Sequence, residues 1–175
     1  MEQIKDYQFL ILSDDKDRDQ HERNLYKAFY EKYPWYAKRF FKVVANERLI
    51  PNIPYSDQII YGAKNNRDII ISFSACTNLE NTETEQIGFS IPKDKAIIEG
   101  LHFYGNLDKS RFFGMEEIYT AFMNYALGDL KQKGYNKIYS TCSRRLLIVY
   151  KKMDFQVQES LEVDGDTEYL IMREL

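Results

Sequence analysis

The first candidate for chemistry is a carboxylate inside one of the most apolar stretches of the chain. Glu99 lies in the run Ile97-Ile-Glu-Gly-Leu101, which is typical of a strand. Burying a carboxylate costs free energy unless it faces a cleft or has a partner, and apolar neighbours raise its pKa. Such a group can transfer protons. The alternative is that the strand alternates and that Glu99 faces solvent.

A second candidate is the start of the clearest helix, which we expect over residues 114–133. Its apolar side chains fall on one stripe, and Gly134 supplies a left-handed stop. Arg111 and Gly114 stand at its beginning. A helix N-terminus presents unpaired N–H groups and a positive dipole end, and a glycine lets a phosphate approach closely. The alternative is an ordinary helix start with two glutamates in its first turn.

The composition bounds the class of protein. The 175 residues are enough for one buried core and too few for two ordinary domains, so we expect a single domain over residues 1–175. Hydrophobic residues make up 44% and charged residues 29%, as in a globular chain. The 24 basic and 27 acidic residues give a net charge of −3, which argues against a broad nucleic-acid or anionic-membrane surface.

The cysteines, the histidines and the N-terminus exclude further classes. Cys76 and Cys142 are the only cysteines, and we expect free thiols, with Cys142 packed in the sheet. Only His21 and His102 stand beside them, so no zinc-type spacing can be assembled and we expect no metal. The first residues do not resemble a signal peptide, and no apolar stretch approaches the ~20 residues of a membrane helix. We expect a cytoplasmic protein with no membrane or nucleic-acid partner.

Hydrophobic periodicity places the remaining elements. We expect helices over residues 20–33, 35–46, 114–133 and 144–152. We expect strands over residues 9–12, 58–63, 69–75, 86–91, 95–104, 137–142, 155–161 and 169–172. The polar residues 78–85 indicate a surface loop. This order predicts an α/β fold, in which helices flank a mixed, mostly antiparallel sheet with one parallel crossover.

The order of elements resembles the GNAT N-acyltransferase superfamily over nearly the whole chain. In that family the helix after the fourth strand begins with the pattern Gln/Arg-x-x-Gly-x-Gly/Ala. The stretch Arg111-Phe-Phe-Gly114-Met-Glu116 is similar, with Glu116 where the family has a small residue. The family also often reads Tyr-x-x-x-Gly-Phe at its next helix. Tyr150-Lys-Lys-Met-Asp154-Phe155 is similar to this, and Asp154, which replaces the glycine, tolerates a left-handed backbone.

The resemblance implies transfer of an acetyl or other acyl group from acyl-CoA to the primary amine of a small molecule or peptide. It implies that Glu99 is the general base, with His102 as a possible substitute. It implies that Tyr150 donates a hydrogen bond or proton to the departing sulfur, and that a backbone N–H between Leu101 and Phe103 stabilises the oxyanion. The residues expected to bind acetyl-CoA or another acyl-CoA are Leu101, His102, Phe103, Arg111, Phe112, Phe113, Gly114, Met115, Glu116 and Ser143.

Two other functions stay open. One is an N-acyl amino acid or acyl-homoserine-lactone type synthase, which takes its acyl chain from an acyl carrier protein and depends less on the loop that Glu116 interrupts. The other is a non-catalytic sensor or interaction module that keeps the fold and has lost the chemistry. The departures from the family pattern at Glu116, Ser143 and Asp154 are what such a loss of function would produce. The resemblance also suggests a homodimer, with the strands after Phe155 as the place to pair.

Overall fold

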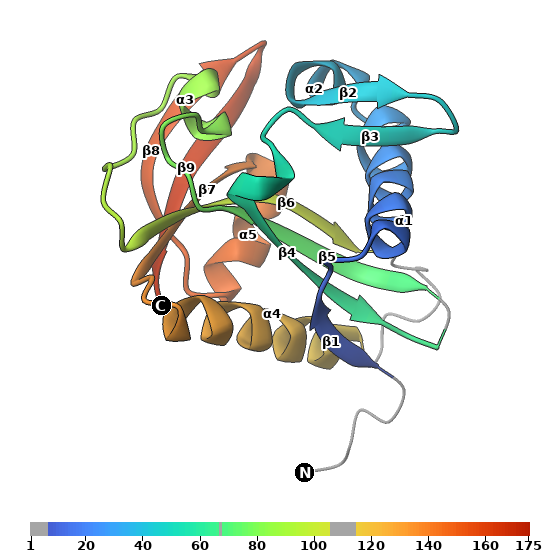
Figure 1. The fold of residues 1–175 in the computed structure, drawn as a ribbon. Coiled ribbons are helices and arrows are strands. Elements are labelled where there is room, and N and C mark those ends of the chain that lie inside the picture. Colours follow the sequence, from blue (N-terminus) through green and yellow to red (C-terminus); the bar gives the residue numbers. More distant parts are fainter. Residues whose placement is uncertain (1–6, 67, 106–114) are drawn as a thin grey trace. The chain divides into compact units, whose positions relative to one another are not determined.

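The computed structural model describes residues 7–66, 68–105 and 115–175 (Figure 1). The strands are β1 (Gln8–Ile11), β2 (Phe41–Val44), β3 (Arg48–Pro51), β4 (Gln58–Lys64), β5 (Ile69–Cys76), β6 (Ile97–Gly105), β7 (Lys137–Ser143), β8 (Gln156–Val163) and β9 (Asp166–Glu174). The helices are α1 (Asp15–Leu25), α2 (Pro34–Phe40), α3 (Glu83–Ile87), α4 (Met115–Gln132) and α5 (Arg144–Lys152), with a π-helical turn η1 (Tyr26–Tyr30) and a 3-10 turn η2 (Tyr55–Asp57).

Seven strands form one mixed sheet in the order β1-β4-β5-β6-β7-β9-β8. β6 and β7 are parallel, and α4 lies between them in the chain, as a parallel crossover requires. β1 is antiparallel to β4, and β9 is antiparallel to both β7 and β8. The predicted α/β fold, with one parallel pair in a mostly antiparallel sheet, is therefore confirmed.

The chain divides into two compact units, each built from two segments of sequence. The first unit holds Met1–Ser74 and His102–Ala126, and the second holds Ala75–Leu101 and Leu127–Leu175. A buried apolar cluster in the first unit contains Leu12, Ile60 and Ile69. A buried cluster in the second contains Leu79, Phe89, Ile91, Ile97, Tyr139 and Leu170. Each unit therefore buries apolar surface of its own, the main favourable term in folding. The single domain over residues 1–175 stays a prediction.

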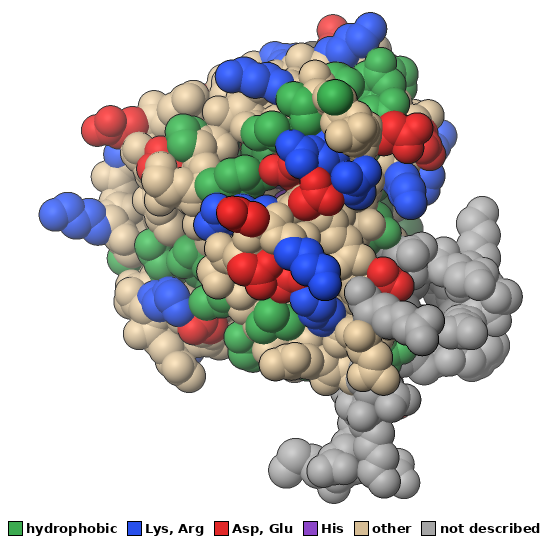
Figure 2. Space-filling model, turned by 45° about the vertical axis from the view of Figure 1, so that its right-hand side comes forward, with side chains coloured by type: hydrophobic (Ala, Val, Ile, Leu, Met, Phe, Trp, Pro, Cys, Tyr) green, Lys and Arg blue, Asp and Glu red, His purple; other side chains and the backbone are tan. Residues whose placement is uncertain are grey.

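In the first unit, α1 begins after Asp14, whose side chain accepts a hydrogen bond from the N–H of Asp17 at 2.8 Å. On the surface of α1, Asp19 pairs with Arg23 at 2.8 Å and with Arg48 of β3 at 2.5 Å. Figure 2 shows acidic and basic side chains intermingled on this face. The described residues of this face thus carry both signs of charge side by side, rather than one broad field of either sign.

The helix expected over residues 35–46 is shorter than predicted. α2 ends at Phe40, and Phe41-Lys-Val-Val44 forms β2, which pairs antiparallel with β3. Between the two strands, Asn46 and Glu47 have φ angles of 64° and 55°, the left-handed values of a tight turn. Stiff β-branched valines followed by an asparagine turn favour a hairpin, and this local preference outweighs the helical spacing of the apolar residues.

The segment between β5 and β6 also differs from the prediction, because the short helix α3 replaces the expected loop and strand. The Thr82 side chain accepts a hydrogen bond from the N–H of Glu85 at 3.2 Å, and Gly88 ends the helix at a φ of 116°. Thr82-Glu-Thr-Glu85 followed by Gly88 is a capping pattern with a glycine stop. Thr82 and Thr84 are buried, so the segment is not a surface loop.

α4 and α5 end as their sequences predict. Gly134 follows α4 at a φ of 94°. After α5, the N–H of Phe155 donates to the C=O of Tyr150 at 3.1 Å, and the N–H of Asp154 donates to the C=O of Lys151 at 3.2 Å. Asp154 has a φ of 61°, so it occupies the left-handed position that glycine fills in most such endings.

Replacing Asp154 with glycine should stabilise the protein by about 0.5–1 kcal/mol, because a left-handed backbone costs most residues with a side chain about 1–2 kcal/mol and glycine almost nothing. Urea unfolding of the two proteins measures the difference. Gly134→Ala is the matched control, since it puts a side chain at the corresponding position after α4 and should lose about 1 kcal/mol. A destabilised Asp154→Gly variant would contradict this account of the helix end.

Candidate functional site

Glu99 of β6 is the centre of a buried polar arrangement in the second unit. It is 1% exposed. Its Oε1 oxygen accepts hydrogen bonds from the backbone N–H of Thr84 at 2.6 Å and from the Thr84 hydroxyl. Its Oε2 oxygen accepts one from the N–H of Glu83 at 3.2 Å. Glu99 therefore does not face solvent: it is a buried carboxylate with partners, which is the condition for burying it at tolerable cost.

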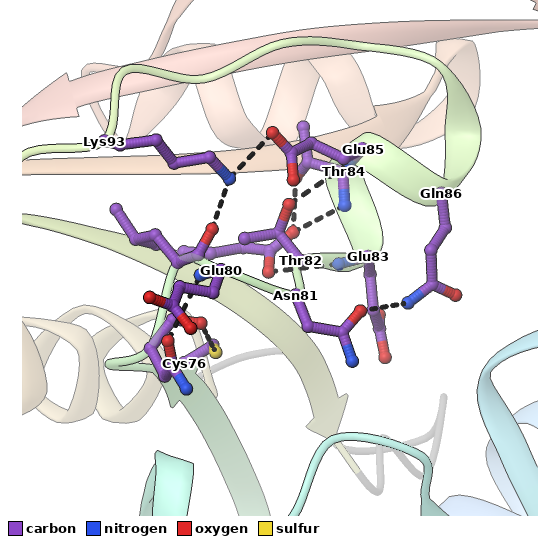
Figure 3. Close-up of polar contacts among 12 residues, drawn as sticks. Cys76, Glu80, Asn81, Thr82, Glu83, Thr84, Glu85, Gln86 and Lys93 are labelled. Atoms are coloured by element: carbon purple, nitrogen blue, oxygen red, sulfur yellow. Dashed lines mark hydrogen bonds and ion pairs between the residues drawn. The ribbon is translucent and has the colours of Figure 1, made fainter.

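The donors to Glu99 all lie in the first turn of α3, where backbone N–H groups have no partner within the helix. Lys93 holds the same segment from another direction. Its ammonium group pairs with Glu85 at 2.7 Å and donates to the C=O of Leu79 (Figure 3). In Figure 1, α3 lies beside the β8–β9 ribbon, and Ile87 at its end packs against the apolar cluster of this unit. The position of α3 is thus fixed on both its polar and its apolar side.

The pKa of Glu99 is raised from 4.5 to about 7, and burial is the largest cause. The hydroxyl and N–H of Thr84 act in the opposite direction, because they stabilise the ionised form. The neighbouring Glu83 carboxylate adds to the rise, while its N–H opposes it. A carboxyl group with a pKa near 7 is about half ionised at neutral pH, and this is the property that a general base needs.

The parallel ladder between β6 and β7 ends at the pair of Gly100 and Ser140. At this pair the Ser140 hydroxyl donates to the C=O of Gly100 at 2.8 Å. Glu99 thus lies one residue before the end of the ladder. Among the described residues, Leu101 is the first residue of β6 outside the ladder with β7.

Tyr150 lies on α5 and packs its ring edge-on against Phe155, with the ring centroids 5.3 Å apart. Burial, and to a lesser extent the nearby Cys142 thiol, raise the pKa of the Tyr150 phenol. The hydroxyl therefore keeps its proton at neutral pH and can donate it in a hydrogen bond. No hydrogen bond among the described residues joins Tyr150 to Glu99. Ser143 is the residue before α5, and its side chain makes no capping hydrogen bond.

Both cysteines are buried free thiols, as the sequence predicts. Burial first, and the Glu168 carboxylate second, raise the pKa of Cys142 to about 12, so this thiol keeps its proton at neutral pH. Within the described residues, no group of three or more His, Cys, Asp or Glu side chains is placed to hold a metal ion. Likewise, none of the helices seen there is long and apolar enough to cross a membrane.

His102 is buried in the first unit among aromatic rings. Its imidazole centroid lies 4.4 Å from that of Phe41. Its Nδ1 lies 3.4 Å from the Ser74 hydroxyl, and its backbone N–H donates to the same hydroxyl at 3.3 Å. The backbone N–H of His102, one of the donors expected to stabilise an oxyanion, therefore already has a partner.

A second buried histidine–serine pair lies in the same unit and was not expected from the sequence. The Nδ1 of His21 is 3.0 Å from the Ser72 hydroxyl. Burial, with a smaller contribution from His102, lowers the pKa of His21 to about 3, so its imidazole is neutral. Ser72 and Ser74 are two residues apart on β5 and share one face of the strand. This alternation of serines is the sequence signal that could have indicated a polar face on β5.

Most of the expected phosphate-binding loop lies outside the described residues, namely Arg111, Phe112, Phe113 and Gly114. Met115 and Glu116 are the first two residues of α4, and the start predicted at Gly114 lies outside the described residues. Glu116 therefore stands in the first helical turn.

Thr84 is the residue of this site that the sequence analysis missed. The capping pattern could have placed it in the first turn of a helix. Nothing local in the sequence indicates that this turn donates hydrogen bonds to Glu99, which is 15 residues further along the chain.

By sequence, the chain matches no protein-family profile and no curated protein. By structure it is similar to the acyl-homoserine lactone synthase LasI, with a TM-score of 0.77 and 14% identity over 96% of this chain and 89% of LasI. It is also similar to the CoA-dependent acyl-homoserine lactone synthase BjaI, whose structure was solved with SAM and isopentyl-CoA. The TM-score is 0.74 and the identity 14%, over 91% of this chain and 76% of BjaI. A third similar structure is a GNAT family acetyltransferase from Elizabethkingia anophelis with acetyl-CoA bound. Its TM-score is 0.57 and its identity 15%, over 98% of this chain and 99% of the acetyltransferase.

These likenesses show that the chain has the GNAT fold, and the resemblance inferred from the sequence is confirmed at that level. The same fold carries both acetyltransferases and acyl-homoserine lactone synthases among these structures. The choice between such activities therefore depends on the residues of the site.

Replacing Glu99 with glutamine should remove the part of the pH dependence of stability that this carboxyl contributes between pH 4.5 and 7. The pKa of this carboxyl is higher in the folded protein than in the unfolded chain, so its contribution to the free energy of unfolding falls as pH rises through this range. The contribution is at most about 3 kcal/mol, since one pKa unit corresponds to about 1.4 kcal/mol. Urea unfolding of both proteins at several pH values across the range measures it.

The His21 imidazole has the opposite effect, because its lowered pKa makes the folded state lose stability as pH falls below 6.5. It is present in both proteins, so its effect cancels in the difference between them. Equal pH dependence in the wild type and in Glu99→Gln would contradict the raised pKa.

Proposed function

We propose that this protein transfers an acetyl or other acyl group from acyl-CoA to the primary amine of a small molecule or peptide. The observation that carries the proposal is Glu99, a buried and hydrogen-bonded carboxyl group with a pKa of about 7. It lies one residue before the end of the β6–β7 ladder. The GNAT fold supports the same reaction, since structures of this fold include an acetyltransferase with acetyl-CoA bound.

The first half of the reaction joins the amine to the acyl group. Glu99 takes a proton from the amine, and the nitrogen lone pair forms a C–N bond to the thioester carbon. The electron pair of the C=O bond moves to its oxygen. A backbone N–H of Leu101 or Phe103 donates a hydrogen bond to the oxyanion that results.

The second half releases the thiol. The oxyanion re-forms its C=O bond, the C–S bond breaks and the sulfur leaves with the electron pair. The protonated phenol of Tyr150 donates a hydrogen bond or a proton to that sulfur, so that the products are an amide and free CoA. A proton then returns to Tyr150, and Glu99 releases the one that it took from the amine.

The acyl-CoA phosphates lie at the start of α4 in this proposal. Arg111 and Gly114 supply a positive charge and a close backbone approach there, with Phe112, Phe113, Met115 and Glu116 as the neighbouring contacts. Glu116 opposes the phosphate charge, so the proposal requires its carboxylate to point away from them. Ser143 contributes a hydroxyl that α5 does not use for capping.

Glu99→Gln should lower kcat/KM for amine acylation by about 10²–10⁴, the usual contribution of a general base. Tyr150→Phe should lower kcat by about tenfold or more, because the leaving sulfur loses its donor. The measurement is thiol release from acetyl-CoA with a set of primary amines. The matched controls are Glu159→Gln on the exposed face of β8 and Tyr135→Phe after α4.

Full activity in both Glu99→Gln and Tyr150→Phe would remove the proposed roles. Absence of turnover with any amine, together with no rise in melting temperature on addition of acetyl-CoA, would favour the non-catalytic module instead.

A second candidate is a synthase that takes its acyl chain from an acyl carrier protein, and α5 favours it. Leu146, Ile148 and Val149 on this helix are 50%, 69% and 51% exposed. Basic residues are exposed on the same helix, namely Arg144, Arg145, Lys151 and Lys152. An exposed apolar surface with basic residues around it suits an acidic partner that docks through a helix.

The double variant Arg145→Glu and Lys152→Glu should raise KM for an acyl carrier protein by about tenfold, because the reversed charges repel an acidic partner. The same variant should leave KM for acyl-CoA unchanged. Lys95→Glu with Lys131→Glu makes the same change of charge at exposed positions outside α5. If both double variants change KM for the carrier protein equally, α5 is not the docking surface.

A homodimer is a further part of the proposal, and β8 is where two copies would pair. β8 stands at the end of the strand order, so one of its edges has no strand beside it among the described residues. Its first residues are exposed. An open edge of this kind can pair with a second chain.

A further inference from the structure

Thr84 makes two of the three described hydrogen bonds to the carboxyl group of Glu99. Its N–H lies 2.6 Å from Oε1, and its hydroxyl donates to the same oxygen. Thr84 is 1% exposed, so water does not compete for these donors. Among the described residues, it is the one whose side chain hydrogen-bonds to this carboxyl.

α3 does not need this hydroxyl for its own formation. The cap of the helix is Thr82, whose side chain accepts from the N–H of Glu85. A threonine inside a helix is a poor helix former, because its β-branched side chain loses rotamer freedom there. The Thr84 hydroxyl therefore serves to hydrogen-bond Glu99 rather than to stabilise α3.

The two oxygens of the Glu99 carboxyl are held differently. Oε1 accepts two hydrogen bonds from Thr84, while Oε2 accepts a single longer one from Glu83 at 3.2 Å. A proton on Oε1 would compete with both Thr84 donors for the lone pairs of that oxygen. A proton on Oε2 disturbs only the longer bond, so Oε2 is the better proton acceptor.

We propose that Thr84 is a positioning residue for Glu99: it fixes Oε1, so that Oε2 is the oxygen that takes the proton of the attacking amine. This inference rests on the proposed function, since it gives Thr84 a part in the reaction through Glu99. The titratable groups beside the carboxyl are Glu83 on α3 and Tyr139, which is opposite Glu99 in the ladder with β7. Lys93 on the same segment is paired with Glu85.

The test is the pKa of Glu99, followed by ¹³C NMR of its side-chain carboxyl in the free protein. Thr84→Val keeps the shape of the side chain and removes the hydroxyl, so the pKa should rise by roughly one unit as the ionised form loses a donor. Thr84→Ser keeps the hydroxyl and should restore the wild-type value. Thr84→Ala serves in place of the valine variant if the latter does not fold.

Thr82→Val is the matched control, because it removes a hydroxyl from the same segment and weakens the cap of α3. If Thr84 acted only by holding α3 in place, the two valine variants would shift the pKa of Glu99 equally. The proposal requires the shift in Thr84→Val and not in Thr82→Val. An unchanged pKa in Thr84→Val overturns it, whatever the activity of the protein.

The pH dependence of kcat/KM separates this inference from the proposed function. The rate falls at low pH where the base is protonated, so Thr84→Val should move this acid limb to higher pH by the same amount as the pKa. If the pKa moves and the acid limb does not, Glu99 is not the base. That result would overturn the reaction step, even though the hydrogen bond itself would stand.

Discussion

The cost of burying one carboxylate organises the second unit of this protein. Glu99 stands among isoleucines on β6, where a carboxylate without partners would be strongly destabilising. The first turn of α3 supplies the donors that it needs, and the carboxylate in turn satisfies N–H groups that this helix cannot pair by itself. Each group therefore satisfies the other, and these hydrogen bonds help to hold the segment between β5 and β6 against β6.

The same arrangement leaves Glu99 poised between its charged and neutral forms. Burial makes the charged form unfavourable, and the donors of Thr84 and Glu83 recover part of that loss. With fewer donors the carboxyl would stay protonated at neutral pH, and with more it would be too weak a base. A pKa of about 7 results from the balance between burial and a small number of hydrogen bonds.

The parts of the structure that the sequence predicts well are those that local chemistry decides. The end of α5 is an example, since Asp154 takes up the left-handed backbone that its place in the Tyr150 to Phe155 motif requires. β2 and α3 could also have been recognised, because an asparagine turn and a capping pattern are local signals. The contact between Thr84 and Glu99 could not, because it joins two segments that only the folded chain brings together. The buried pair of His21 and Ser72 also joins two distant segments, although the alternation of Ser72 and Ser74 on β5 was a partial signal for it.

The measurement that tests the central claim most directly is the pH dependence of kcat/KM for acylation of a primary amine by acetyl-CoA, in the wild type and in Glu99→Gln. If Glu99 is the general base, the wild-type rate falls on the acid side with a midpoint near pH 7, and the residual rate of the variant shows no such limb. The same acid limb in both proteins would contradict the account, because some other group would then accept the proton.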